Sequence, residues 1–358
     1  MATIYVKTRA YNAEPYIARA IESILNQTHT DWVYYLCNNG STDKTGEIIE
    51  HYAAQDSRIK TFHNQENWVF TETTQPFLSM EQDLSDDTYC CILDADDEYL
   101  PNFMAQTLRF AQDNRCELVL TAYEMHDVPK EQVTVRGKIY ETDQYFSAQA
   151  YQRTAPFWLG CVSHVWATLY TAGLAKKYQA PAIDLGSAAD TYQAWEWVRH
   201  SEGIGFISTP LYRYYQYGIG NNTISAVAPF NPQRPAQLEA IIQQIERVLE
   251  DKIGELGQAV RKQLANAYLG HLSLTLSMLH NSTDNPQKKL AYLTDFMKHP
   301  RLLAAIETSH LEASENVLEW CNTLLVRYGR VVKGKPLAKA LKAANRLNAV
   351  YKQAHLPL

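Results

Sequence analysis

The segment CCILDADDEYLP, residues 90–101, passes from apolar residues straight into a cluster of acids. Asp94 and Asp96 stand one residue apart, and a turn at the end of a strand can direct two such carboxylates toward one ligand. Carboxylate oxygens suit Mg²⁺ or Mn²⁺, which commonly bind one or two carboxylates together with phosphate oxygens of a substrate. The residues therefore predict a metal site. We expect the alternative, a solvated acidic turn, only for Asp97 and Glu98.

The elements that would position these acids are visible upstream as alternating patterns. Short apolar runs predict strands, and the amphipathic runs between them predict helices. Strands are expected at residues 4–8, 32–37, 59–63 and 89–94, and helices at residues 13–25 and 46–55. This alternation is typical of an α/β fold with a mostly parallel sheet flanked by helices. The carboxyl ends of parallel strands share one edge, so Arg9, Asn39 and Asp94 are expected to converge there.

The rest of the chain changes character at the proline-containing stretch VAPFNPQRPAQ. The sequence before this stretch is mixed and rich in aromatic residues, whereas the sequence after it has the apolar spacing of long helices. We therefore predict two halves of one α/β domain at residues 1–100 and 101–228. A C-terminal α-helical region is predicted at residues 229–358.

Composition excludes some classes of protein. A hydrophobic content of 46% is ordinary for a globular protein, and a net charge of −6 argues against general nucleic-acid binding. The six cysteines form no CxxC pattern, which indicates reduced thiols in a cytoplasmic protein. We find neither a signal-peptide pattern nor an apolar run of about 18 residues.

The charge is unevenly distributed along the chain. No acid follows Glu319, while eight lysines and arginines do. The stretch GKPLAKALKAANRLNAVYKQA has the spacing of an amphipathic helix with lysines away from its apolar side. Three roles stay open for these C-terminal helices: a peripheral contact with the inner face of a membrane, packing against the helical region, or a dimer contact.

Several motifs in this order resemble those of a known family. YNAEPYIARAIESILNQTHTDW, NNGSTDKTGEIIEHY and CCILDADDEYLPNFM are similar to the nucleotide-binding half of family 2 glycosyltransferases with the GT-A fold. AADTYQAWEWVRHSEGIGFISTPLYRYYQYGIGNNTIS resembles the acceptor half. The resemblance covers residues 3 to about 225 and leaves the C-terminal third uncovered.

The resemblance implies roles for particular residues. Arg9 and Tyr11 would lie against the nucleotide base, and Asn39 would accept a hydrogen bond from a uracil ring. Asp94 would contact the ribose or a metal-bound water, and Asp96 would coordinate Mn²⁺ or Mg²⁺ on the diphosphate. The general base would be Asp190, which could instead cap the helix that follows it.

The reaction implied is an inverting transfer of a hexose-class sugar. The donor would be a nucleotide diphosphate sugar, with uridine favoured, and the acceptor a glycan or a lipid-linked saccharide. The carboxylate base would take the proton of the acceptor hydroxyl, and the divalent metal would neutralise charge on the leaving diphosphate. This chemistry would make the chain a metal-dependent glycosyltransferase of polysaccharide biosynthesis.

The chain also departs from the family pattern. Asn38 and Asn39 replace two aspartates, NWVFTETTQP replaces a stretch that carries an arginine, and Tyr217 stands where a histidine near the metal is expected. Phosphate binding would then depend on Arg9, Lys7 or Arg213. These losses leave open a non-catalytic subunit that binds a sugar nucleotide or serves assembly. A nucleotidyltransferase is disfavoured, because KTRAYNAE lacks a glycine-rich phosphate loop.

Three further residues are candidates for acceptor binding. Trp158 and Trp195 could stack on sugar rings, and His164 could contact an acceptor hydroxyl. Packing in the core is an equally good interpretation for the tryptophans, and it is the favoured one for the histidine.

Overall fold

The computed structural model describes residues 2–67, 80–179, 181, 185, 188–217 and 230–356. The chain divides into two compact units. The N-terminal unit comprises residues 1–227 with 251–253, and the C-terminal unit comprises residues 228–250 with 254–358. Each unit is described by itself.

The first half of the N-terminal unit is a parallel sheet of the predicted kind. Its strands are β1 (Ile4–Ala10), β2 (Trp32–Asn39), β3 (Ile59–Asn64) and β4 (Tyr89–Ile92). β1 pairs in parallel with both β2 and β4, and β2 pairs in parallel with β3. The helices α1 (Ile17–Leu25) and α2 (Thr45–Ala53) connect these strands. The predicted fold class is confirmed.

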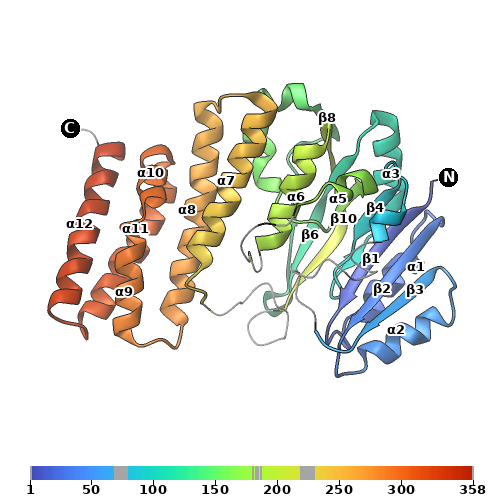
Figure 1. The fold of residues 1–358 in the computed structure, drawn as a ribbon, viewed down its shortest axis with the longest axis horizontal. Helices are drawn as coiled ribbons and strands as arrows, with labels where there is room; N and C mark the ends of the chain where they lie inside the picture. The colour runs from blue at the N-terminus through green and yellow to red at the C-terminus, as the bar shows by residue number, and fades with distance from the viewer. Residues whose placement is uncertain are drawn as a thin grey trace. The chain divides into compact units, whose positions relative to one another are not determined.

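The second half extends the same sheet with strands of both directions (Figure 1). Its strands are β5 (Glu98–Tyr99), β6 (Leu118–Asp127), β7 (Gln132–Arg136), β8 (Gln144–Ser147), β9 (Thr168–Thr171) and β10 (Gly203–Gln216). The strand order is β3-β2-β1-β4-β9-β6-β10-β5, with β7 beside β6 and β8 beside β10. β9 runs antiparallel to both β4 and β6, so these two strands point in the same direction on either side of it.

Four α-helices accompany the second half: α3 (Phe103–Asn114), α4 (Tyr151–Trp158), α5 (Ala172–Lys176) and α6 (Ala189–His200). Short 3₁₀ turns lie at Met80–Asp83, Val128–Lys130, Ala148–Ala150 and Leu159–Cys161. α3 ends where Arg115 adopts a left-handed conformation with φ of 52°, which stops the helix.

The core follows from the side-chain periods of strand and helix. On β1, Ile4 and Val6 are fully buried, and their neighbours in sequence are partly exposed. On α1, Ile17, Ile21 and Ile24 point into the same cluster at helical spacing. Each such side chain stabilises the fold by about 1.5–3 kcal/mol through burial. The six cysteines are all free thiols.

The C-terminal unit is built from helices. They are α7 (Arg234–Ile253), α8 (Gln258–Asn281), α9 (Pro286–Phe296), α10 (Pro300–Thr308), α11 (Leu311–Gly329) and α12 (Lys335–His355). Asn285 caps α9 by accepting a hydrogen bond from the backbone N–H of Lys288, and proline begins both α9 and α10. Within the described parts of the chain, no helix is both long enough and apolar enough to cross a membrane.

Candidate active site

The carboxyl ends of β1 and β4 are joined beside the acids. Thr8 donates from its hydroxyl to the carbonyl of Leu93 at 2.6 Å, and Tyr34 donates to Thr8 Oγ1 at 2.8 Å. The Leu93 N–H in turn donates to the carbonyl of Lys7 at 3.1 Å. These buried bonds fix the end of β4, so the residue after it, Asp94, is delivered to a defined point on the sheet edge.

Arg9, Asp94 and Asp190 lie close enough for their charges to act on one another. Burial lowers the pKa of Arg9, and the nearby Asp94 and Asp190 oppose that shift. Burial also raises the pKa of Asp94 well above its usual value; the charges of Asp190 and Asp96 raise it further, and Arg9 lowers it. The structure thus brings together Arg9, the pair Asp94 and Asp96, and Asp190 from three distant parts of the sequence. Three of these four residues are acids, so negative charge is in surplus in this largely buried setting.

Asp190 lies in the first turn of α6 and does not cap that helix. The N-cap is Ala188, and no side-chain bond closes the helix start. Burial raises the pKa of Asp190 to about 6, and the positive charge of Arg9 limits the rise. A carboxylate with a pKa near the working pH is suited to act as a general base.

Asp96 is held through its main chain. Arg19 of α1 donates to the Asp96 carbonyl, and the Tyr217 hydroxyl donates to the same oxygen at 3.3 Å. Arg19 also donates to the Tyr217 hydroxyl at 2.5 Å. Burial raises the pKa of the Asp96 carboxyl, although the backbone and the Arg19 charge oppose this. The bonds from Arg19 and Tyr217 therefore position the turn through the Asp96 carbonyl and do not involve its carboxylate.

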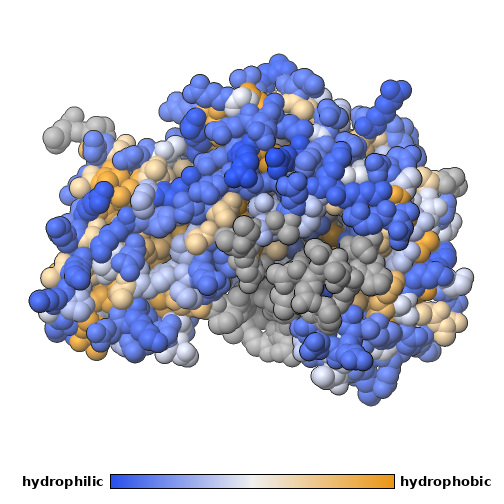
Figure 2. Space-filling model, viewed as in Figure 1, coloured by the Kyte–Doolittle hydropathy of each residue, from blue (hydrophilic) through white to orange (hydrophobic). Residues whose placement is uncertain are grey.

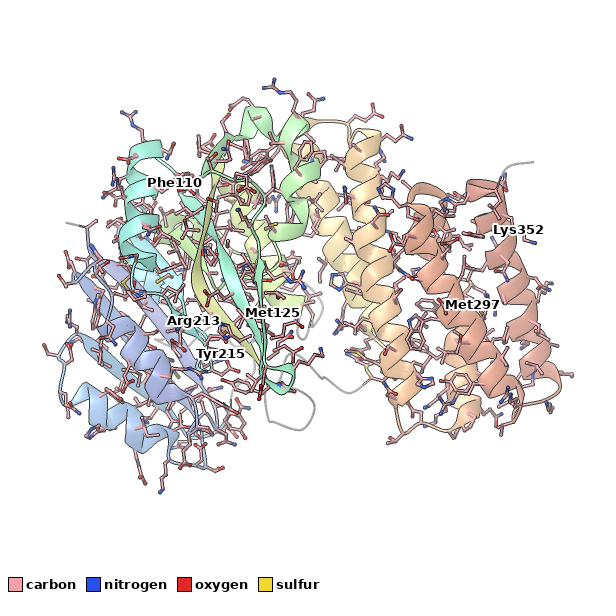
Figure 3. All side chains as sticks on the ribbon, turned by 180° about the vertical axis from the view of Figure 1, so that it is seen from behind. Phe110, Met125, Arg213, Tyr215, Met297 and Lys352 are labelled. Atoms are coloured by element: carbon pink, nitrogen blue, oxygen red, sulfur yellow. The ribbon has the colours of Figure 1, made fainter. Side chains whose placement is uncertain are left out.

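The prediction that Asp97 and Glu98 are solvated was wrong. Asp97 is 1% exposed and accepts hydrogen bonds from the Tyr212 hydroxyl and the Tyr215 N–H, both at 2.8 Å. Glu98 accepts from the Tyr215 hydroxyl at 2.5 Å. The reason is that β5 pairs with β10, which covers this side of the turn (Figure 3 shows Tyr215 with Arg213 on that strand).

Two of the three cations named from sequence, Lys7 and Arg213, pair with acids outside the group of Arg9, Asp94, Asp96 and Asp190, and one cation was missed. Lys7 forms an ion pair with the buried Glu81, while Arg213 contacts Glu98 at 3.4 Å and Glu124 at 3.0 Å. Arg19 instead lies at the acidic turn, with its guanidinium 3.9 Å from the centre of the Tyr215 ring. No local pattern marks Arg19, because it is one polar residue on an amphipathic helix.

Asn39 belongs to a group of asparagines at the end of β2. It is 2% exposed, its Oδ1 accepts from Asn64 Nδ2 at 2.7 Å, and its Nδ2 donates to Asn67 Oδ1 at 2.7 Å. These two bonds hold the Asn39 side chain in a fixed orientation at the end of β2. Tyr11 is 39% exposed at the neighbouring turn. The replacement stretch NWVFTETTQP lies outside the described residues except for Asn67.

The three acceptor candidates are buried. Trp158 and Trp195 have no exposed surface, and their ring centres lie 6.1 Å apart in a stacked arrangement. His164 is 6% exposed and stacks on Trp166 at 3.9 Å. Burial lowers the pKa of His164 to about 3, so it stays neutral. Of the two alternatives, the structure favours packing for all three.

The acids fit a divalent cation whose coordination is completed by a substrate. Asp94 and Asp96 present carboxylate oxygens in a site with surplus negative charge, which a cation would relieve. Among the residues that the structure describes, no group of three metal-ligating side chains is found. Such a site would therefore hold Mg²⁺ or Mn²⁺ through one or two carboxylates together with diphosphate oxygens.

Comparison with protein families gives a match over the N-terminal unit. Residues 6–169 match the model of Glycosyl transferase family 2. The putative glycosyltransferase EpsH of Bacillus subtilis is 27% identical over 209 residues, which cover 57% of this chain and 58% of that protein. The putative teichuronic acid biosynthesis glycosyltransferase TuaG of the same organism is 29% identical over 122 residues, 34% of this chain and 47% of TuaG. The chain thus spans about half the length of these relatives.

Solved structures resemble the whole chain in fold. Staphylococcus aureus TarS 1-349 in complex with UDP-GlcNAc aligns with a TM-score of 0.62 at 16% identity, covering 99% of this chain and 92% of that one. The same protein in complex with UDP aligns with a TM-score of 0.61. The likeness extends over the C-terminal helices, which the family model does not reach.

Proposed function

We propose that the protein transfers a hexose-class sugar from a nucleotide diphosphate sugar to a saccharide acceptor with inversion. Residues 6–169 belong to glycosyltransferase family 2, and the chain has the GT-A fold. The observation that carries this proposal is the gathering of Arg9, Asp94, Asp96 and Asp190 at one sheet edge. An inverting transfer needs a base on the acceptor side and charge neutralisation on the side of the leaving group.

Asp190 takes the role of the base. Its raised pKa keeps the carboxylate basic enough to accept the proton of an acceptor hydroxyl, while leaving it ionised at neutral pH. The charge of the nearby Arg9 favours the ionised form of Asp190 and limits the rise of its pKa. The position of Asp190 in the first turn of α6 also places the carboxylate at the positive end of the helix dipole.

Asp96, with Asp94 beside it, would hold Mn²⁺ or Mg²⁺. When bound, this ion supplies neutralisation of the negative charge that develops on the departing diphosphate. Arg19 and Tyr217 position the turn through the carbonyl of Asp96 and do not engage its carboxylate. Arg9 adds positive charge at the same edge. Arg19 also adds positive charge there, in place of the arginine and the histidine that the family pattern has and this chain lacks.

Uridine is the favoured base of the donor. Asn39 lies at the carboxyl end of β2, where the resemblance places the acceptor of a uracil ring N–H, and Tyr11 provides an exposed aromatic ring at the next turn. TarS, which shares the fold, was solved with UDP and with UDP-GlcNAc, and this supports the same choice. For the acceptor we propose a glycan or lipid-linked saccharide of polysaccharide biosynthesis at the cytoplasmic side, a class supported by the name of TuaG.

The test is turnover of nucleotide sugars by the purified chain. With Mn²⁺ or Mg²⁺ present, we expect UDP release from one of a panel of donors, and we expect Asp96→Ala to abolish it. Calorimetry with UDP provides the second measurement. Metal-dependent UDP binding without turnover on any acceptor would instead identify a nucleotide-sugar-binding subunit, and the absence of both binding and turnover would overturn the proposal.

A further inference from the structure

The last helix carries a regular row of cations. Lys335, Lys339, Lys342 and Arg346 are spaced by four, three and four residues, which places them on one face of α12. All four side chains are exposed. We call these four residues the basic face.

A second side of α12, about 120° around the helix from the basic face, is occupied by packing. Ala340, Ala343, Ala344 and Leu347 are each at most 4% exposed, and α12 contacts α9, α10 and α11 of its own unit. Of the roles left open for this segment, packing against the helical region is thus realised by this side. The helix is anchored through small residues, so the basic face is directed away from the unit.

The basic face has no counter-charges of its own. No acid follows Glu319 in the sequence. In the described part of the C-terminal unit, ion pairs are formed by Lys298, His299 and Arg301, and none by a cation of α12. Like charges four residues apart disfavour a helix, so this arrangement does not serve local stability. It serves attraction of an anionic partner.

Apolar side chains are also exposed on α12 and beside its two ends, with Leu341 about 100° or more around the helix from each cation of the basic face. Val331 just before the helix is 69% exposed, Leu341 within it is 46% exposed, and Leu356 just after it is 56% exposed. Figure 2 shows apolar side chains interspersed among hydrophilic ones over the C-terminal helices. A soluble acidic polymer makes no use of exposed apolar residues, whereas the interface of a bilayer accommodates both kinds of side chain.

We propose that the basic face, together with Val331, Leu341 and Leu356, is a docking surface for a bilayer that contains anionic lipids. Lysine and arginine heads contact lipid phosphates, and the three apolar side chains enter the boundary between headgroups and acyl chains. The surface does not depend on the proposed chemistry, and its test needs neither donor nor acceptor.

The test is co-sedimentation of the full chain with vesicles. Vesicles of phosphatidylcholine containing phosphatidylglycerol should bind the protein at about 0.1 M salt, and binding should fall as salt rises. Vesicles of phosphatidylcholine alone should bind it far less. The variant Lys339→Gln/Lys342→Gln/Arg346→Gln should lose about a hundredfold in partitioning, at roughly fivefold per cation.

A matched variant controls for net charge. Lys262→Gln/Lys288→Gln/Lys298→Gln removes three cations of the same unit, on α8, on α9 and in the turn before α10, and should leave vesicle binding within about threefold. Leu341→Ser should weaken binding even at high salt, because it removes a contact that salt does not screen. Unchanged circular dichroism would show that each variant is folded. The proposal is overturned if the wild-type chain ignores anionic vesicles, if both triple variants lose binding equally, or if Leu341→Ser binds normally and a soluble polyanion displaces the vesicles.

Discussion

The two units differ in the burial of their charged residues. At the sheet edge of the N-terminal unit, acids are partly or fully buried, and their pKa values are raised. On α12 of the C-terminal unit, cations are exposed and unscreened by acids of the same helix. Buried charge responds to protons and specific partners, whereas exposed charge responds to salt. Changes in pH or in specific contacts should therefore affect the site at the sheet edge, whereas changes in salt should affect the cations of α12.

The largest effect is expected from the proposed base. Asp190→Asn preserves size but cannot accept a proton, so kcat/KM should fall by about 10²- to 10⁴-fold while UDP affinity changes little. The measurement is a steady-state assay of UDP release alongside calorimetry. Glu307→Gln, which neutralises an exposed acid of the C-terminal unit, is the control and should behave as wild type.

The pKa of Asp190 also predicts the direction in which kcat/KM changes with pH. With a pKa of about 6, Asp190 is protonated and inactive at lower pH, so kcat/KM should rise as pH increases through about 6.

A raised carboxyl pKa also means that the folded chain binds more protons than the unfolded chain. Stability contributed by this group is thus present below its unfolded pKa and is lost as pH rises through about 6. An acidic limb that persists unchanged in Asp190→Asn would assign the base elsewhere.

An intermediate effect is expected from Asp97, on stability. Asp97→Ala leaves the Tyr212 hydroxyl and the Tyr215 N–H without their acceptor in a buried site. The free energy of unfolding should fall by about 2–4 kcal/mol. Urea unfolding followed by tryptophan fluorescence measures it. Asp97→Asn keeps one acceptor oxygen and should lose less. Equal losses in both variants would contradict this prediction, because they would show that one acceptor oxygen and an unchanged shape preserve nothing.

Features that depend on local sequence could be predicted, and features that depend on distant parts of the chain could not. The alternation of strands and helices in residues 4–94 and the helical spacing after residue 232 follow local periods, and both are found in the structure. The meeting of Asp94 with Arg9 also followed from the rule that parallel strands end at one edge. The burial of Asp97 did not, because it depends on β10, more than a hundred residues away, pairing with β5. Antiparallel β9 and the place of Arg19 are non-local in the same sense.

The smallest effect expected at the site concerns Arg19, which acts as a positioning residue. Its guanidinium bonds the Asp96 carbonyl and the Tyr217 hydroxyl, stacks on Tyr215 and pairs with Glu98 at 3.3 Å. Arg19→Met keeps the aliphatic stem but releases the turn. The metal concentration needed for half-maximal UDP release should therefore rise about tenfold, corresponding to about 1.4 kcal/mol, with a smaller change in kcat at saturating metal.

Arg58→Met provides the matched control for this measurement. Arg58 also stacks on an aromatic ring, that of Trp32 at 3.7 Å, and also pairs with an acid, Asp56, but it lies before β3 and away from the acidic turn. It should leave the metal requirement unchanged. A lysine at position 19, Arg19→Lys, keeps the charge without the planar fork and should fall between wild type and Arg19→Met. If Arg19→Met and Arg58→Met shift the metal requirement alike, Arg19 contributes to stability alone, and the buried turn is positioned by β10 without α1.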